Sequence, residues 1–312
     1  MSWRGAGGTQ CPAPDCCKEG KGRMRTFILG ATGTIGAPLT DELLRHGHEL
    51  VALARSDAAE RDLTAKGAAV VHGDLRNPHE WAHILREVDA VIHVAATFTE
   101  DMGAVDSGLL DALLAEVERA PRPIRFVYTG GCWLYGATGE RLADESSPFD
   151  PIPAFAWMVE NGRRVLAAPN LDAMIVHPAM VYDRDGGVLR RFIASARDKG
   201  HIEIWGSAET RWPVVHRRDL AAAYRLVLEG GGPGASYCVA AERGVRVGDI
   251  AGVLAQRFGL ADDPVVRGTA EVVAEQGAWA VGPTLDQQMI GARIVQELGW
   301  SPAVTDILSE IA

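Results

Sequence analysis

Three glycines at three-residue spacing follow a short apolar run near the start of the chain. The run Phe27-Ile28-Leu29 leads into Gly30, Gly33 and Gly36, and a helix-like stretch begins directly afterwards. In this context the glycines permit a tight turn, a close backbone approach to a pyrophosphate and close packing of helix on strand. The helix N-terminus would then face phosphate oxygens. The pattern predicts a dinucleotide-binding loop, with an ordinary glycine-rich turn as the alternative. The expected contacts are Gly30, Thr32, Gly33, Thr34, Ile35 and Gly36.

A residue about 20 positions after such glycines reads the adenosine ribose. An acidic residue there would accept a hydrogen bond from the 2′-hydroxyl and repel a 2′-phosphate. This chain has Arg55-Ser56 instead. A guanidinium can stack on adenine and grip a phosphate, and the serine hydroxyl adds a donor. We therefore predict NADP(H) rather than NAD(H), with a solvated surface arginine as the alternative. Asp74 is placed to contact the adenine amino group, to cap the next helix, or to do both.

The composition is that of an ordinary globular chain. Of its 312 residues, 47% are hydrophobic and 23% are charged, which is typical of folded domains. The formal net charge of −10 argues against nucleic acid as a partner. No apolar run approaches the roughly 20 residues needed to span a bilayer. We therefore expect a small-molecule substrate, with no nucleic-acid or membrane partner.

The first 23 residues differ from the rest of the chain. They are rich in Gly and contain Pro, Lys and three of the five cysteines, without the apolar core of a signal peptide. Those cysteines match no zinc-ligand spacing, so we predict no metal site and a disordered N-terminal extension over residues 1–23. Cys132 and Cys238 lie in expected strand ends or cores. This usage suggests no disulfide framework and a reducing, cytoplasmic location.

Apolar, strand-like runs alternate with helix-like stretches over the first half of the chain. Most of the runs are apolar throughout, as expected for strands buried on both faces of a parallel sheet. The runs cover residues 27–29, 49–54, 69–72, 90–95, 125–129 and 173–177. Helices are expected between them, including one over residues 78–87. The pattern predicts an α/β fold with a doubly wound parallel Rossmann sheet.

The alternation becomes less regular after Pro178. We expect helices near residues 188–197, 247–258 and 270–281, and short strands at residues 201–205 and 237–240. Asp219 is placed to N-cap a helix through Leu228. The predicted division is an NADP-binding Rossmann domain over residues 24–178 and a smaller C-terminal substrate lobe over most of residues 179–312. Residues 212–240 are expected to return to the first domain.

The motifs together resemble the extended and atypical short-chain dehydrogenases/reductases, in their epimerase/dehydratase-like branch. The matching segments run in the family's order from about residue 24 to residue 302. They are residues 30–36, 73–75, 93–96, 127–129 with 135–136, 177–178 with 181–182, 215–220 and 298–302. The resemblance implies a role in cofactor binding for Leu75, Ala95, Ala96, Thr129, His177 and Pro178. It also implies that a homodimer is possible.

Four positions depart from the family's catalytic pattern. That pattern is a Tyr-x-x-x-Lys pair with an upstream Ser and Asn, in which the lysine lowers the phenol pKa and the tyrosine transfers a proton. Here Trp157 falls at the tyrosine, Asn161 at the lysine, Gly131 at the serine and Asp106 at the asparagine. An indole cannot transfer a proton as a phenol does, so the family's usual mechanism is not expected.

Three interpretations remain open. The chain is an enzyme with a non-standard acid/base, a non-catalytic NADP(H) sensor similar to the NmrA-like regulators, or an enzyme in which water or substrate supplies the proton. The catalytic candidates are Tyr135, Tyr182, Asp106 and Glu160. Loop packing for the tyrosines, bracing of a helix for Asp106 and plain solvent exposure for Glu160 are the alternatives. His93 and His177 end strands beside the expected cleft, where a packed role is favoured over titration.

Aromatic residues gather in segments expected near the cofactor cleft. Together they suggest an apolar or aromatic pocket for a substrate, although each could equally be an ordinary core tryptophan. The predicted substrate-pocket residues are Thr97, Trp133, Trp157 and Trp212. This pocket favours an enzyme over a sensor. We expect an oxidoreductase or an epimerase/dehydratase-like enzyme that acts on a carbonyl or alcohol of a small organic molecule through a non-standard acid/base.

Overall fold

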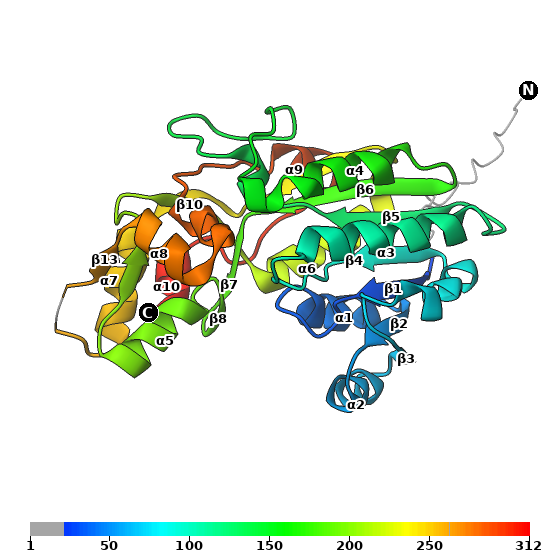
Figure 1. Cartoon of the computed structure of the whole chain (residues 1–312), viewed down its shortest axis with the longest axis horizontal. Helices are drawn as coiled ribbons and strands as arrows, with labels where there is room; N and C mark the ends of the chain where they lie inside the picture. The colour runs from blue at the N-terminus through cyan, green and yellow to red at the C-terminus, as the bar shows by residue number, and fades with distance from the viewer. Residues whose placement is uncertain (1–21, 262) are drawn as a thin grey trace, which may run out of the picture.

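The computed structural model describes residues 22–261 and 263–312 and contains a central sheet of seven parallel strands. Their order is β11-β6-β5-β4-β1-β2-β3, so the chain winds outward in both directions from β1 (Figure 1). This confirms the predicted doubly wound Rossmann sheet. The strands are β1 (Arg25–Leu29), β2 (Glu49–Ala54), β3 (Ala69–His72), β4 (Ala90–His93), β5 (Ile124–Thr129), β6 (Leu171–Pro178) and β11 (Ser236–Val239).

Helices cover both faces of this sheet, because alternate strand residues point to opposite sides. In β1, Ile28 packs with Leu39 and Leu43 of α1, whereas Phe27 and Leu29 belong to the cluster that contains α3 and α4. All three strand residues are fully buried, which explains the uniformly apolar strands. The helices of this domain are α1 (Gly36–Arg45), α2 (Asp57–Ala65), α3 (Met102–Val117), α4 (Trp157–Ala167) and α6 (Arg217–Gly230).

The helix predicted over residues 78–87 is instead two short 3₁₀ helices, η1 (Pro78–Glu80) and η2 (Ala82–Glu87). Trp81 lies between them with φ −130°, outside the helical region. Its indole is buried against Gly73 and donates a hydrogen bond to the Asp74 carbonyl at 2.9 Å. Burial of this indole interrupts the helix that local pattern favoured.

The rest of the chain forms a lobe at the end of the sheet where β6 runs on into β7 (Figure 1). It holds a four-stranded sheet of order β12-β10-β7-β8 and a parallel β9–β13 pair. Most of these strands are too short for an alternation signal and were not predicted. They are β7 (Met180–Asp183), β8 (Gly186–Gly187), β9 (Glu203–Trp205), β10 (Arg211–His216), β12 (Glu242–Arg246) and β13 (Val265–Arg267).

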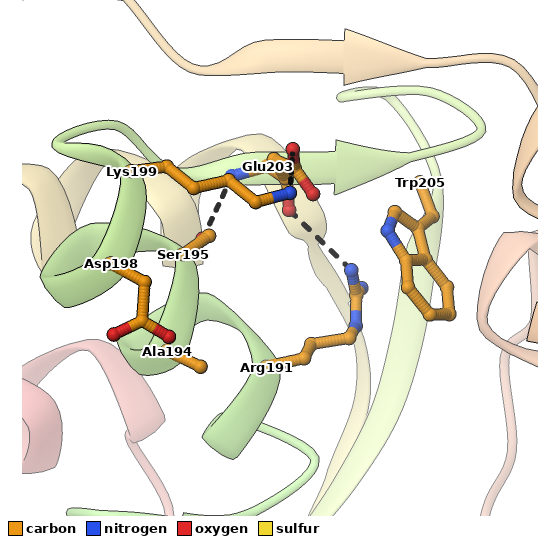
Figure 2. A pocket seen from close by; sticks show the side chains of 7 residues that line it. All are labelled: Arg191, Ala194, Ser195, Asp198, Lys199, Glu203 and Trp205. Carbon is orange, nitrogen blue, oxygen red and sulfur yellow. Dashed lines mark hydrogen bonds and ion pairs between the residues drawn. The ribbon is translucent and has the colours of Figure 1, made fainter.

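The helices of the lobe lie near the expected positions, with α10 (Ile307–Ile311) in addition. The others are α5 (Arg190–Lys199), α7 (Val247–Arg257), α8 (Thr269–Gln276) and η5 (Ala278–Thr284). A further helix, α9 (Ala292–Leu298), packs instead on β11 and α6 of the first domain (Figure 1). Residues 211–216 pair within the small sheet, while α6 packs on α1 and β11 joins the central sheet. A cavity of about 160 Å³ lies between α5 and β9 (Figure 2).

Asp219 does not cap α6, in contrast to the prediction. The helix begins at Arg217, and His216 is the N-cap, its Nδ1 accepting from the Arg218 N–H at 3.4 Å. The Asp219 carboxylate instead accepts hydrogen bonds from the Ala303 and Val304 N–H groups, both at 2.9 Å. It therefore fastens a distant C-terminal segment to the first turn of α6.

The predicted N-terminal extension lies almost wholly outside the described residues. Within them, Cys132 and Cys238 are buried free thiols. No described helix is both long and apolar enough to cross a membrane.

Candidate functional site

The glycine loop between β1 and α1 has backbone contacts that exclude side chains. Gly30 has φ +89°, and a Cβ there would lie 2.8 Å from the Cα of Ala95, beyond the end of β4. A Cβ on Gly36 would lie 1.9 Å from the Gly30 carbonyl oxygen. Both distances are shorter than real Cβ contacts, so the turn and the close helix approach require glycine. This is the cradle that the sequence predicts for a pyrophosphate.

The first turn of α1 presents backbone donors next to this cradle. Among the described residues no side chain caps it, and Ile35 stands at the N-cap position. Thr32 and Gly33 are exposed, whereas the Thr40 hydroxyl ties the helix back to the Ala31 carbonyl at 3.3 Å. Uncapped amides at the positive end of a helix dipole fit an anionic group. The residues present therefore fit a dinucleotide's diphosphate.

Arg55 and Ser56 follow β2 at the same edge of the sheet. The Arg55 side chain is 80% exposed and lies 4.0 Å from the Asp74 carboxylate. The Ser56 Oγ accepts from the Ala59 N–H at 3.3 Å and so caps α2. Asp74 also accepts from the Arg76 N–H at 2.9 Å. The exposed Arg55 guanidinium is thus accessible to a ligand, and the Asp74 carboxylate lies beside the guanidinium.

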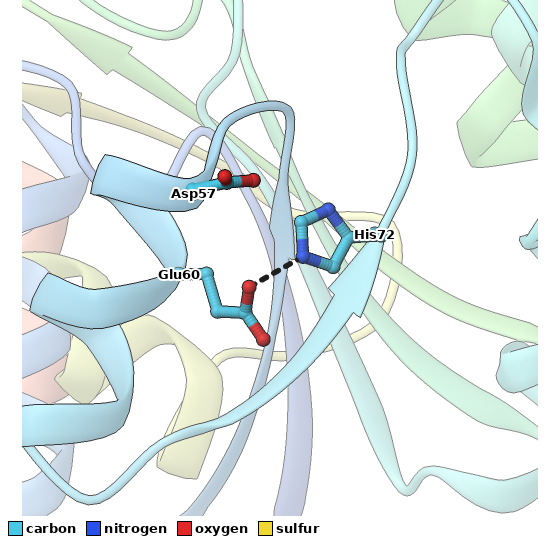
Figure 3. A group of neighbouring side chains, drawn as sticks. All are labelled: Asp57, Glu60 and His72. Atoms are coloured by element: carbon cyan, nitrogen blue, oxygen red, sulfur yellow. Dashed lines mark hydrogen bonds and ion pairs between the residues drawn. The ribbon is translucent and has the colours of Figure 1, made fainter.

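Two carboxylates and one histidine form a cluster between α2 and β3. His72 on β3 pairs in register with Ala54, and its Nε2 lies 2.6 Å from Glu60 Oε2 (Figure 3). Asp57 completes a group whose ligand atoms lie within 4.8 Å of one another. The hydrogen bond and charge of Glu60 raise the pKa of His72. The cluster thus ties the end of β3 to the first turn of α2.

The remaining predicted cofactor residues lie at the carboxyl ends of β3 to β6. Ala96 is exposed, Ala95 and Leu75 are half-buried, and Pro178 is buried. The Thr129 hydroxyl is used within the fold, since it donates to the His93 carbonyl at 2.6 Å and lies 2.7 Å from the Tyr224 hydroxyl. These residues are at the edge where the fold binds ligands. Their contact with a cofactor stays a prediction.

A buried polar network occupies the region where the resemblance expects the acid/base machinery. The Asp106 carboxylate accepts from Tyr128 Oη at 2.6 Å, from Asn161 Nδ2 at 2.8 Å and from His93 Nε2 at 2.7 Å. The His93 Nδ1 accepts from the Ala95 N–H at 3.4 Å, so Nε2 carries the donated proton. All four side chains are buried. Sequence reasoning missed this network, because only the fold brings its members together.

The charge of Asp106 is stabilised within this network. Burial by itself would raise the pKa of the carboxyl, but His93 and the hydrogen bonds from Tyr128 and Asn161 hold it below the ordinary value. The lone pairs of the carboxylate are therefore committed to three donors. The arrangement braces α3 and α4 against the ends of β4 and β5.

Trp157 and Asn161 share one face of α4, where Trp157 packs against α3 and Asn161 hydrogen-bonds within the Asp106 network. Trp157 packs on Gly103 of α3, where a Cβ would lie 2.8 Å from the indole, and its Nε1 donates to the Ala154 carbonyl at 2.9 Å. Asn161 also contacts Ser107 at 3.2 Å and accepts from Arg164 at 3.3 Å. Neither side chain reproduces a phenol held by an ammonium group.

Tyr135 and His177 are buried side by side, and the exposed Phe149 packs over both rings. The ring centroids of Tyr135 and His177 are 5.5 Å apart, and Phe149 lies 5.2 Å from Tyr135. The Tyr135 hydroxyl is 3.4 Å from Cys238 Sγ, and burial raises the pKa of this phenol. Burial lowers the pKa of His177 to about 4, so its imidazole is neutral at pH 7. His177 Nδ1 accepts from the Gly131 N–H at 3.4 Å, and Nε2 has no partner among the described groups.

The other two catalytic candidates are apart from this group. Tyr182 is buried on β7 with an edge-on contact to His216, and no described group bonds its hydroxyl. Burial raises the pKa of the Tyr182 phenol. Glu160 is exposed on α4, 3.5 Å from Arg163. The structure therefore does not bring Tyr135, Tyr182, Asp106 and Glu160 into one constellation, and each catalytic role stays a prediction.

The predicted substrate-pocket residues lie in three separate places. Trp133 and Trp157 belong to one apolar cluster with Phe155 and Met102, and Trp133 also covers Gly282 of η5. Thr97 is half-buried in the loop after β4, where its hydroxyl accepts from Thr99 at 2.9 Å. Trp212, the fourth predicted pocket residue, is buried in the lobe, and its indole N–H donates to the Pro283 carbonyl at 2.9 Å.

Comparison with known proteins agrees with this fold and loop. The model of the NAD dependent epimerase/dehydratase family matches residues 26–240. The chain belongs to this family, whose members are nucleotide-binding, oxidoreductase-like proteins. An uncharacterized protein of Schizosaccharomyces pombe is 27% identical over 93% of this chain and 98% of its own length.

Two further similarities come from a named relative and a solved structure. The 2-alkyl-3-oxoalkanoate reductase of Stenotrophomonas maltophilia is 27% identical over 68% of each chain. The dTDP-glucose 4,6-dehydratase DesIV of Streptomyces venezuelae, solved with NAD bound, superposes with a TM-score of 0.77 at 24% identity. That match covers 93% of this chain and 95% of DesIV, and it shows the shared fold.

Proposed function

We propose that the protein is an NADP(H)-dependent oxidoreductase that acts on a carbonyl or alcohol of a small organic molecule. The observation that carries the proposal is the side-chain-free cradle at Gly30 and Gly36 beside the uncapped start of α1. Family membership supports a nicotinamide dinucleotide in this cradle. The exposed guanidinium of Arg55 supports the 2′-phosphorylated form.

When bound, the nicotinamide group supplies or accepts the hydride. The residues of the chain bind and orient the reactants: the loop holds the diphosphate, and Arg55 holds the 2′-phosphate. Thr97, Trp133 and Trp157 are proposed to contact an apolar substrate. Tyr135, Tyr182, Asp106 and Glu160 remain the side-chain candidates for proton transfer. Burial of the first three favours a proton from water or the substrate itself.

The named relatives support carbonyl or alcohol chemistry. Besides the 2-alkyl-3-oxoalkanoate reductase, the Dictyostelium discoideum sterol-4-alpha-carboxylate 3-dehydrogenase is 22% identical over 66% of this chain. Each name describes interconversion of a carbonyl and an alcohol. The aromatic cluster around Trp133 and Trp157 is consistent with an apolar substrate of this kind.

Titration of the full chain with NADPH and NADH tests the cofactor. We expect NADPH to bind more tightly, and Arg55→Asp to weaken NADPH at least about tenfold while NADH changes little, because a charge-assisted contact is lost. Arg61→Asp, at an exposed arginine of the neighbouring helix α2, is the matched control. Equal affinities of the wild-type protein for the two cofactors would reject the NADP(H) assignment.

A non-catalytic NADP(H) sensor is the second candidate. The specific observation in its favour is that Trp157 and Asn161 are engaged in packing and in the Asp106 network. A panel of aldehydes, ketones and alcohols with the bound cofactor separates the two functions. Turnover supports the oxidoreductase. Cofactor binding without turnover, together with a protein partner retained in only one redox state, supports the sensor.

A further inference from the structure

Asp57, Glu60 and His72 bring two carboxylates and one imidazole together at the outer edge of the central sheet (Figure 3). One ligand atom of each side chain lies within 4.8 Å of the other two. Within residues 22–261 and 263–312, no other group of three or more His, Cys, Asp or Glu side chains converges in this way. The sequence does not reveal the cluster, because His72 lies 12 residues beyond Glu60 and on a different element.

Two regular elements hold these three side chains. Asp57 is the first residue of α2 and Glu60 follows three positions later, so both lie on one face of the first turn. Ser56 caps this turn through its hydroxyl. His72 is the last residue of β3 and pairs in register with Ala54 of β2. Ligands on a capped helix turn and on a paired strand are positioned before an ion arrives.

The negative charge of this cluster is not offset by arginine or lysine. In the part of the chain that the structure describes, the Glu60 carboxylate pairs with His72 alone, and the Asp57 carboxylate has no Arg or Lys nitrogen within 4.0 Å. Arg55, the nearest arginine in the sequence, lies beside Asp74 instead. Asp57 and His72 are exposed and Glu60 is half-buried. A cation from solution can therefore reach all three groups, and its charge offsets the repulsion between the carboxylates.

The donor set selects the kind of ion. One imidazole nitrogen and two carboxylate oxygens are ligands that zinc accepts, with water in the fourth position. Calcium and magnesium favour sites made of oxygen alone. Two ligands of one tetrahedral zinc ion lie about 3.4 Å apart, so small side-chain rotations bring the three donors to an ion. The ion then replaces the proton between His72 Nε2 and Glu60 Oε2, which are 2.6 Å apart.

We propose that Asp57, Glu60 and His72 bind one divalent transition-metal ion, preferably Zn²⁺, with water completing its coordination. Each carboxylate supplies one oxygen, and the imidazole supplies the Nε2 lone pair while Nδ1 carries its proton. The ion cross-links the end of β3 to the first turn of α2 and stabilises the folded chain as the site fills. The site is separate from the glycine cradle and goes beyond the proposed oxidoreductase function.

Titration of the full chain with ZnCl₂ and no nicotinamide cofactor, followed by NMR of the histidine rings, tests the site. The His72 signals are identified by their absence from the spectrum of His72→Gln. We expect them to shift saturably, whereas those of the exposed His79 and His83 change little at the same zinc concentration. MgCl₂ at equal concentration should leave His72 unchanged, since magnesium favours oxygen ligands. The histidine signals report ligation by His72 itself, whatever the cysteines of the chain bind.

Variants of the two carboxylates separate the cluster from a lone surface histidine. Glu60→Gln should weaken the response of His72 to zinc at least about tenfold, because a charged ligand is lost. Asp57→Asn should act in the same direction and covers the case in which Glu60→Gln does not fold. Asp62→Asn, at an exposed carboxylate of the same helix outside the cluster, should leave the response unchanged.

Four results would overturn the metal site. They are the lack of a saturable shift at His72, equal shifts at His79 and His83, an equal response to magnesium, and an unchanged zinc response in the carboxylate variants. Because no cofactor is present in these titrations, each of these results leaves the NADP(H) proposal untouched.

Discussion

The glycine loop and the first turns of α4 lie in the same domain but follow different rules. In the loop, bare backbone atoms approach one another so closely that only glycine fits at Gly36. Around α4, by contrast, side chains fill the space, and Asp106, His93 and Asn161 satisfy one another. The glycine loop leaves backbone N–H donors free for a ligand, whereas the side chains around α4 leave few free hydrogen-bonding groups. The comparison separates nucleotide binding, for which the fold is preformed, from acid/base chemistry, for which it is not.

The largest effect is expected from a methyl group in the loop. Gly36→Ala places a Cβ within 1.9 Å of the Gly30 carbonyl oxygen, so the backbone must shift. We expect a loss of about 3 kcal/mol or more in the free energy of unfolding, together with loss of cofactor binding. Urea unfolding and cofactor titration measure both. The control is Gly108→Ala in α3, where nothing lies within 4 Å and where alanine should stabilise by about 0.5–1 kcal/mol.

The Asp106 network should affect stability more than cofactor binding. Asp106→Asn brings an amide against donors from Tyr128 and Asn161, and we expect a loss of about 2–3 kcal/mol in the free energy of unfolding. Asp111→Asn, at an exposed position on the same helix, should change little. If Asp106→Asn removed turnover while stability stayed at the wild-type value, Asp106 would be catalytic and the contrast between the two regions would fail.

The pH dependence of stability should report on His177. Its pKa is about 4 in the folded protein against 6.5 for the free side chain, so the unfolded chain binds more protons between these values. The contribution of His177 to the free energy of unfolding is therefore complete above pH 6.5 and is lost as the pH falls toward 4. We expect a loss of about 2 kcal/mol from pH 7 to pH 5. Urea unfolding at both pH values should show a smaller loss in His177→Gln, whereas the exposed control His83→Gln should retain the full loss.

The smallest effect is expected at the tyrosine hydroxyls. Tyr182→Phe removes a buried hydroxyl that no described group bonds, and stability should rise by up to about 1 kcal/mol. Tyr135→Phe loses only a contact to Cys238 Sγ and should change stability little. Turnover of the two variants then tests the acid/base candidates. Wild-type turnover rates in both variants would exclude the two tyrosines as proton donors. A drop of about a hundredfold in the turnover rate of one variant would identify its tyrosine as the proton donor.

Much of the nucleotide-binding domain could be predicted because its signals are local. Strands buried on both faces are apolar throughout, and the glycine spacing reflects contacts within a single turn. The 3₁₀ segment at Trp81 and the cap of α6 escaped prediction, since each depends on a partner elsewhere in the chain. Trp81 contacts Gly73, and Asp219 binds residues 303–304. Local pattern cannot reveal such partners.

By itself, the sequence determined the parallel α/β sheet, the cradle at Gly30 and Gly36, and the absence of a Tyr-x-x-x-Lys pair at Trp157 and Asn161. These features follow from residue type and short-range spacing. Only the tertiary structure decided that the Asp106 carboxylate of α3 is held by His93 of β4, and that the Arg191 guanidinium lies among aromatic rings. Such environments depend on which distant segments pack together, and they set the protonation and ligand preferences of these side chains.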